Sequence, residues 1–159
     1  MIQRVQSIFL ALVAICMIAA IFMPTWLKGT VEGDEFMVVA LMDATNLTIF
    51  NNGEKVGSTS TYYIAIISGL AAIIAFASLF SFKNRMTQVK FNLLNTLLIG
   101  GVMMINIYFY YYYPETQEAL KTKWGVGFFL PFAALLFNNL ANRFIKKDEQ
   151  LVKSVDRLR

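Results

Sequence analysis

The chain has 159 residues, of which 57% are hydrophobic and only 15% are charged. This composition excludes an ordinary soluble domain, and the length leaves room for one domain. Four stretches of 19 to 27 residues carry no charged side chain, and each can hold the roughly 20 residues that cross a hydrocarbon core about 30 Å thick. The sequence therefore predicts an all-α membrane protein, a bundle of four transmembrane helices near residues 7–27, 62–82, 93–113 and 124–145.

The first charge-free stretch has the position of a secretory signal peptide. Only one basic residue, Arg4, precedes it, its apolar run is longer than a typical signal core, and no small-x-small cleavage site precedes Pro24. We therefore expect an uncleaved anchor that stays in the membrane.

The segment after the first helix, residues 28–61, is the longest predicted loop. It contains the apolar runs FMVVALM and NLTIF, and Asn52-Gly53 follows the second run as a turn signal. We expect a small β-hairpin or sheet here. The acidic residues of the loop lack the regular spacing of a cation-binding loop, so they are interpreted as solvated carboxylates and no metal site is predicted.

The distribution of Lys and Arg predicts the orientation. The two ends of the chain and the loop between the second and third helices hold ten basic and three acidic residues, whereas residues 28–61 and 114–123 hold four and seven. Because basic segments stay on the cytoplasmic side, both termini and the tail, residues 146–159, are predicted to be cytoplasmic. The positive charge suits anionic lipid headgroups, so no nucleic-acid partner is expected.

Trp and Tyr residues gather at the opposite, outer end of the predicted helices. The sequence YFYYYYPE closes the third helix, and four consecutive tyrosines point all round a helix, so they do not form one face of a ligand pocket. We interpret these residues as an aromatic rim that anchors the helices at the headgroups. A platform for a lipid, a glycan or a partner is the alternative. The rim comprises Trp26, Tyr62, Tyr63, Tyr110, Tyr111, Tyr112, Tyr113 and Trp124.

Amide side chains cluster toward the inner end of the third and fourth helices. Asn92 and Asn95 share one face of the third helix, Asn138 and Asn142 share one face of the fourth, and the helices are antiparallel, so both pairs lie at one depth. Amides facing lipid would stay unpaired, so these should turn inward and form interhelical hydrogen bonds. The alternative is a hydrated vestibule that opens to the cytoplasm.

The tail carries a narrow apolar stripe surrounded by basic residues. Because acidic residues are mixed among them, we interpret it as a docking element for a protein partner. A helix lying on the inner leaflet and a simple extension of the fourth helix are the alternatives. The docking residues are Leu151, Val155, Arg157, Leu158 and Arg159.

The sequence shows no catalytic pattern. It contains no histidine, its single Cys16 lies in the middle of a predicted span, and the only charged side chain within a span is Arg143, at the inner end of the fourth. We therefore expect a protein that is not an enzyme and that needs no cofactor.

Three segments carry a family resemblance: MIQRVQSIFL at the start, FKNR after the second helix, and FLPFAALLFNNLANRFIKKDEQLVKSVDRLR at the end. Over its whole length the chain resembles an uncharacterised family of small four-helix inner-membrane proteins of Bacteroidota, a domain-of-unknown-function family. The resemblance implies a multi-pass protein of the bacterial inner (cytoplasmic) membrane. It implies no activity and no site residues.

Two functions fit these patterns. The first is a non-enzymatic accessory or assembly subunit of a larger inner-membrane complex, which contacts the lipid bilayer and either a membrane-protein partner or a second copy of itself. The second is a small transport or pore-forming component, oligomeric if a single bundle is too narrow. A pore would need intramembrane charge or a continuous polar path, and the sequence shows neither.

Overall fold

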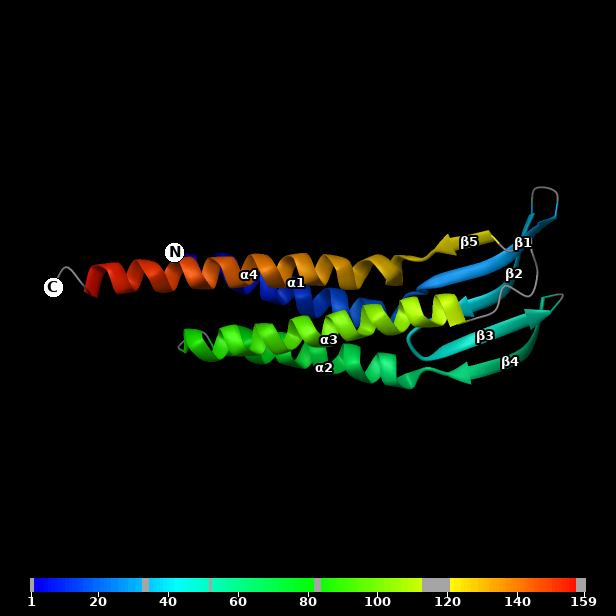
Figure 1. The fold of residues 1–159 in the computed structure, drawn as a ribbon, viewed down its shortest axis with the longest axis horizontal. Coiled ribbons are helices and arrows are strands. Elements are labelled where there is room, and N and C mark those ends of the chain that lie inside the picture. Colours follow the sequence, from blue (N-terminus) through cyan, green and yellow to red (C-terminus); the bar gives the residue numbers. More distant parts are fainter. Residues whose placement is uncertain (1, 33–34, 52, 82–83, 113–120, 157–159) are drawn as a thin grey trace.

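The computed structural model describes residues 2–32, 35–51, 53–81, 84–112 and 121–156 (Figure 1). These residues form four helices, which are α1 (Ile2–Phe22), α2 (Tyr62–Phe80), α3 (Arg85–Tyr112) and α4 (Val126–Asp156). They also form five strands, which are β1 (Trp26–Glu32), β2 (Glu35–Met42), β3 (Asn46–Asn51), β4 (Glu54–Ser60) and β5 (Lys121–Trp124). The helices lie side by side in one bundle, and the strands extend from one end of it.

The expectation of an all-α four-helix bundle is wrong. The five strands form one antiparallel sheet in the order β4-β3-β2-β1-β5, so the protein is a mixed α/β fold. The sheet expected within residues 28–61 is part of it, and Gly53 turns the chain from β3 to β4 in the left-handed conformation, with φ at 82°. The sheet extends beyond that loop on both sides in sequence.

Strands β1 and β5 account for most of the difference from the predicted fold. Helix α1 ends at Phe22 rather than near residue 27, because Pro24 offers no N–H and disfavours helical dihedrals at Met23. Counting uncharged residues does not separate an apolar helix from the start of an apolar strand. Strand β5 is only four residues long and mostly polar, and it pairs with β1 through the register Trp26↔Trp124.

Helices α3 and α4 extend farther at the end remote from the sheet than the predicted spans do. Helix α3 begins at Arg85 rather than near residue 93, and α4 runs to Asp156 rather than ending near residue 145. The charge pattern marks only the part of a helix that is apolar enough for lipid. Polar turns that continue the same helix are therefore missed.

The buried positions of each helix alternate at spacings of three and four residues, as in coiled-coil seams. Helix α1 packs against α2 and α4, and α3 packs against the same two helices. The seam positions are Gln6, Leu10, Val13, Met17 and Ala20 in α1, Ile64, Ser68, Ala71, Ala75 and Ser78 in α2, Gln88, Asn92, Asn95, Ile99, Val102 and Asn106 in α3, and Gly127, Pro131, Ala134, Asn138, Ala141 and Ile145 in α4.

The outward faces of the helices are more apolar than parts of the seam. Large apolar side chains such as Ile73, Leu97 and Met104 are 63–75% exposed, while Asn92 and Asn138 are fully buried. In water this distribution would expose a large apolar surface at a high cost. All four helices are long and apolar enough to span a membrane.

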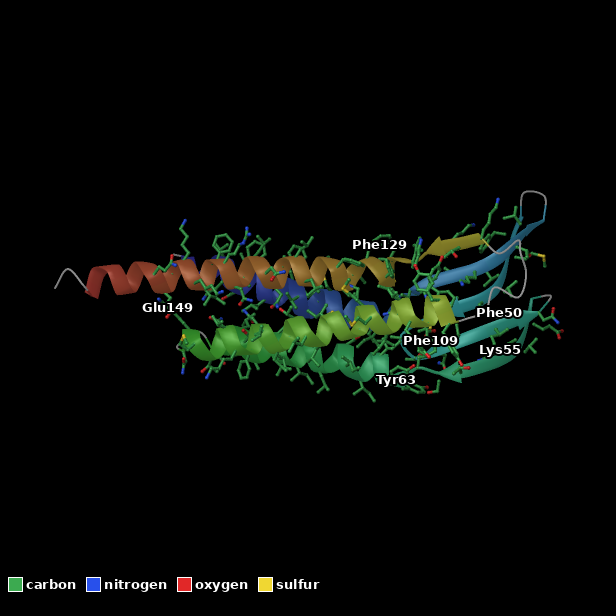
Figure 2. All side chains as sticks on the ribbon, in the orientation of Figure 1. Phe50, Lys55, Tyr63, Phe109, Phe129 and Glu149 are labelled. Atoms are coloured by element: carbon green, nitrogen blue, oxygen red, sulfur yellow. The ribbon has the colours of Figure 1, made fainter. Side chains whose placement is uncertain are left out.

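The sheet joins the bundle where two connections cross. The N–H groups of Gly125 and Gly127 donate to the main-chain oxygens of Thr25 (2.9 Å) and Pro24 (3.0 Å). A Cβ atom on Gly127 would lie 2.4 Å from the main-chain oxygen of Met23, so only glycine permits this approach. Nearby, Tyr63 of α2 faces Phe109 of α3, with ring centroids 6.3 Å apart (Figure 2). The main-chain contacts of Gly125 and Gly127 fix the sheet relative to α1 and α4, and the ring contact joins α2 to α3.

Candidate functional site

The inner amide cluster forms a hydrogen-bonded network across three helices. Ser78 Oγ of α2 donates to Asn92 Oδ1 of α3 at 2.6 Å, and Asn92 Nδ2 donates to Asn142 Oδ1 of α4 at 3.0 Å. Asn138 Nδ2 donates to the main-chain oxygen of Asn92 and to Thr96 Oγ1, both at 2.8 Å. Asn92 therefore connects α2, α3 and α4 at this depth.

Asn95, the fourth residue of the predicted cluster, stays outside this network. Its side chain is fully buried, and neither Oδ1 nor Nδ2 has a hydrogen-bond partner among the described residues. Within the part of the chain that the structure describes, the side-chain oxygens of Asn138, Gln88 and Gln6 are also buried without a partner. Leaving a buried polar group unpaired costs about 1–3 kcal/mol, so the seam holds more hydrogen-bonding capacity than the described residues use.

An ion pair closes the end of the bundle beyond the amide network. Arg85 Nη2 at the start of α3 lies 2.8 Å from Asp148 Oδ2 of α4, and Arg85 Nη1 donates to the main-chain oxygen of Asp148 at 3.0 Å. This pair is not predicted from the sequence. Both fall in predicted inner segments, but only the contact between α3 and α4 brings them together.

The predicted aromatic rim divides into exposed and packed rings. Those with exposed side chains are Tyr62, Tyr63, Tyr111, Tyr112 and Trp124. Trp26 is fully buried, and the ring of Tyr110 packs against both Trp26 (6.2 Å between centroids) and Trp124 (4.9 Å). Tyr113 lies outside the described residues. The structure therefore brings Trp26, Tyr110 and Trp124 together. Tyr63 contacts Phe109 instead, and Tyr112 stacks on Tyr108 within α3.

Lys28 is the residue at this end of the bundle that the sequence analysis missed. Only 2% of it is exposed, and its Nζ donates to the main-chain oxygen of Tyr110 at 3.0 Å. The same Nζ lies 4.5 Å from the ring centroid of Tyr110 and 5.7 Å from that of Trp26, distances at which a cation is attracted to an aromatic face. Lys28 and Trp26 lie two residues apart on β1, so they share one face of the strand. The sequence indicates this proximity only if residues 26–28 are assigned to a strand.

The predicted tail docking residues are placed only in part. Leu151 and Val155 lie in α4, which continues without a break to Asp156; their side chains are not described. Arg157, Leu158 and Arg159 lie outside the described residues. Continuity with α4 fits the alternative of a helical extension, and docking by the tail stays a prediction.

Metal and thiol chemistry have little support in the described part of the chain. No group of three or more His, Cys, Asp or Glu side chains there could hold a metal ion. Cys16 is a free thiol, half-buried in the middle of α1. The described side chains are arranged for packing, hydrogen bonding and charge placement.

Comparison with protein families adds one assignment. The model of the family described as "Domain of unknown function (DUF4293)" matches residues 2–158, almost the whole chain. The chain belongs to the DUF4293 family. No curated protein matches this DUF4293 chain. The match therefore extends over both the bundle and the sheet, and it brings no activity with it.

Proposed function

We propose that this DUF4293 protein is a non-enzymatic accessory or assembly subunit of a larger complex in the inner membrane of a Bacteroidota bacterium. The observation that carries the proposal is the fixed mounting of the sheet on a bundle of four helices that are long and apolar enough to span a membrane. Buried Lys28 holds β1 to the end of α3, and the close crossing at Gly127 holds β1 and β5 to α1 and α4. Such a mounting suits the presentation of a protein-binding surface.

The orientation we propose places the sheet outside the cytoplasm and both termini inside it. Of the eleven Lys and Arg residues that the structure describes, seven lie toward the end remote from the sheet, where Figure 1 also places the two termini. Basic segments are retained on the cytoplasmic side. The exposed tyrosines at the ends of α2 and α3 that adjoin the sheet suit the outer headgroup region.

The edge strand β4 is the part of the sheet that we expect a partner to contact. It is the last strand of the sheet beside β3, and every residue in it except Gly57 is exposed. An exposed edge offers unpaired N–H and C=O groups to a strand of another protein. Val56, 67% exposed, adds an apolar contact at its centre.

Purification of the full-length protein at its natural level in native nanodiscs tests this function. We expect a companion membrane protein in a constant ratio, lost on Val56→Lys and retained on Val31→Lys, a control with the same change on the inner strand β1. If the protein is recovered only by itself, or if both variants retain the companion, the proposed contact at β4 is wrong.

A second function is favoured by the unpaired amides, which suit a hydrated vestibule in a small transport component. Asn95 and Asn138 place unpaired side-chain atoms in the seam at the depth of the Asn92 network. On this proposal, Asn95→Cys reacts with a small hydrophilic thiol reagent supplied from the cytoplasmic side, and Ile99→Cys one turn deeper reacts more slowly. Absence of reaction at both positions would exclude the vestibule.

A further inference from the structure

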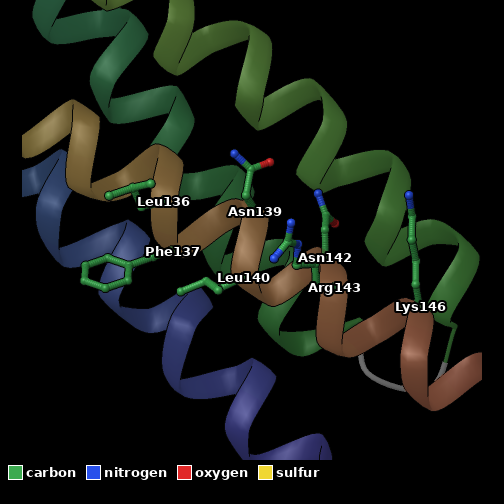
Figure 3. Close-up of a pocket in the computed structure, with 7 residues that line it drawn as sticks. All are labelled: Leu136, Phe137, Asn139, Leu140, Asn142, Arg143 and Lys146. Carbon is green, nitrogen blue, oxygen red and sulfur yellow. The ribbon is translucent and has the colours of Figure 1, made fainter.

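A groove runs along the outer surface of α4, toward the end remote from the sheet. Its volume is about 620 Å³, and the described residues that line it all belong to this one helix (Figure 3). Asn142 and Lys146 point from α4 toward α3, and Phe137 and Leu140 point toward α1. The lining residues are Leu136, Phe137, Asn139, Leu140, Asn142, Arg143 and Lys146.

The chemistry of the groove changes along the helix. Leu136, Phe137 and Leu140 line the part nearer the middle of the bundle, and Arg143 and Lys146 line the part nearer its end. Leu136 and Lys146 are separated by about 15 Å of helical rise. With the proposed orientation, the apolar part lies at the depth of the inner-leaflet acyl chains and the basic part at the depth of the headgroups.

The charges of the groove have no opposite charge within it. No acidic residue is among the described residues that line it, and Asp148, the next acid along α4, is engaged by Arg85. Arg143 and Lys146 are exposed and form no ion pair or hydrogen bond with the described residues. Asn142 accepts a hydrogen bond from Asn92 through Oδ1, which leaves its Nδ2 as a donor beside the two cations.

We propose that this groove binds one anionic phospholipid of the inner leaflet. Its phosphate is held by Arg143, Lys146 and the Nδ2 donor of Asn142, because phosphate oxygens accept charge-assisted hydrogen bonds. One acyl chain lies along Leu136, Phe137 and Leu140. The inference rests on the orientation given with the proposed function, and it names a ligand for a surface distinct from the sheet.

The inferred site also touches the amide network. Asn142 accepts a hydrogen bond from Asn92, and Asn92 accepts one from Ser78 of α2. A lipid bound at Asn142 therefore contacts one residue of the network that joins α2, α3 and α4. Because it binds the folded state, it should stabilise the bundle.

Native mass spectrometry and thermal unfolding of the full-length protein in detergent test the inference. Phosphatidylglycerol should give bound-lipid peaks and raise the unfolding midpoint; phosphatidylcholine and inorganic phosphate at the same concentration should do neither. Arg143→Gln/Lys146→Gln should weaken phosphatidylglycerol binding about tenfold or more, given the attraction of each cation to anionic lipid. Lys90→Gln/Lys147→Gln, which removes two exposed cations near the same end, should change it less than twofold.

A charge-preserving variant separates charge from folding. Arg143→Lys/Lys146→Arg should retain most of the binding. Equal stabilisation by phosphatidylcholine or by inorganic phosphate would overturn the inference, as would an equal loss in the control variant. Conversion of a dimer to a monomer by Arg143→Gln/Lys146→Gln would instead show that a second copy covers the groove. These experiments use the isolated protein, so their outcome does not depend on whether a companion protein is found.

Discussion

At the scale of single residues, Lys28 shows how a charge is accommodated where the sheet meets the helices. A buried ammonium group needs compensation, because removing it from water costs several kcal/mol. Here the compensation comes from a main-chain oxygen in the last turn of α3, whose helix dipole is negative at that end, and from two aromatic rings. Lys28 therefore joins β1 to α3.

Replacing Lys28 should destabilise this junction. We expect Lys28→Ala to lower the free energy of unfolding by about 2 kcal/mol, since a charged hydrogen bond and cation–aromatic contacts are lost in a buried place. Lys55→Ala on the exposed strand β4 is the matched control, with a change within about 0.5 kcal/mol. Thermal unfolding in detergent measures both. Equal midpoints for the two variants would show that Lys28 does not hold the sheet.

The two central asparagines should respond differently to loss of the amide. Asn138→Leu removes two hydrogen bonds to α3 and should destabilise the protein by about 1 kcal/mol. Asn95→Leu removes only unpaired groups, so we expect no loss of stability and a small gain. Unfolding midpoints of both variants in one detergent test this. A loss at Asn95 as large as at Asn138 would reveal a bound partner for Asn95, such as water, and would favour the vestibule.

At the scale of elements, the sequence was informative where one property decides the structure. The four apolar stretches predicted the four helices, because a run long enough for a bilayer has few other uses. The exact ends of those helices were not predicted. Strands β1 and β5 were not predicted either. These features depend on contacts between segments that are distant in the sequence. Strand β5 forms because it pairs with the neighbouring strand β1, with Trp124 opposite Trp26, and neither local composition nor length indicates that pairing.

The candidate site was predictable to the same degree. Helical spacing placed Asn92, Asn138 and Asn142 at one depth, and they do connect there. The same reasoning grouped Asn95 with them, although its amide makes no bond, because a shared helical face does not determine which side chains reach one another. Lys28 was missed since a Lys at the edge of an apolar stretch normally faces water.

The connection from α1 to β1 lies very close to the connection from β5 to α4. Adding one methyl group there should therefore lower the stability of the protein strongly. Gly127→Ala should destabilise the protein by about 2 kcal/mol or more, because the new Cβ would meet main-chain oxygens that cannot move independently. Gly100→Ala, inside α3 with nothing within 4 Å of the added atom, is the control and should be neutral or stabilising by up to about 1 kcal/mol. Circular dichroism melting curves compare them. Similar midpoints would mean that the crossing is loose.

At the scale of the whole molecule, different kinds of residue occupy the two ends of the fold and the region between them. One end carries the termini, the ion pair of Arg85 with Asp148 and most of the basic residues; the other carries the sheet and the tyrosines. Between them, apolar side chains cover the outside of the helices and amides lie in the seam. This arrangement supports a membrane anchor that presents a sheet on the side opposite the termini. The position of the sheet relative to the membrane is the central claim.

Cysteine labelling in intact cells tests that claim most directly. In a Cys16→Ala background, single cysteines at Ser58 on β4 and at Asn84 before α3 both occupy exposed positions at opposite ends of the molecule. An impermeant thiol reagent added outside should label the Ser58→Cys protein and should label Asn84→Cys only after the inner membrane is permeabilised. Labelling of Asn84→Cys in intact cells, with Ser58→Cys protected until permeabilisation, would contradict the account and place the sheet in the cytoplasm.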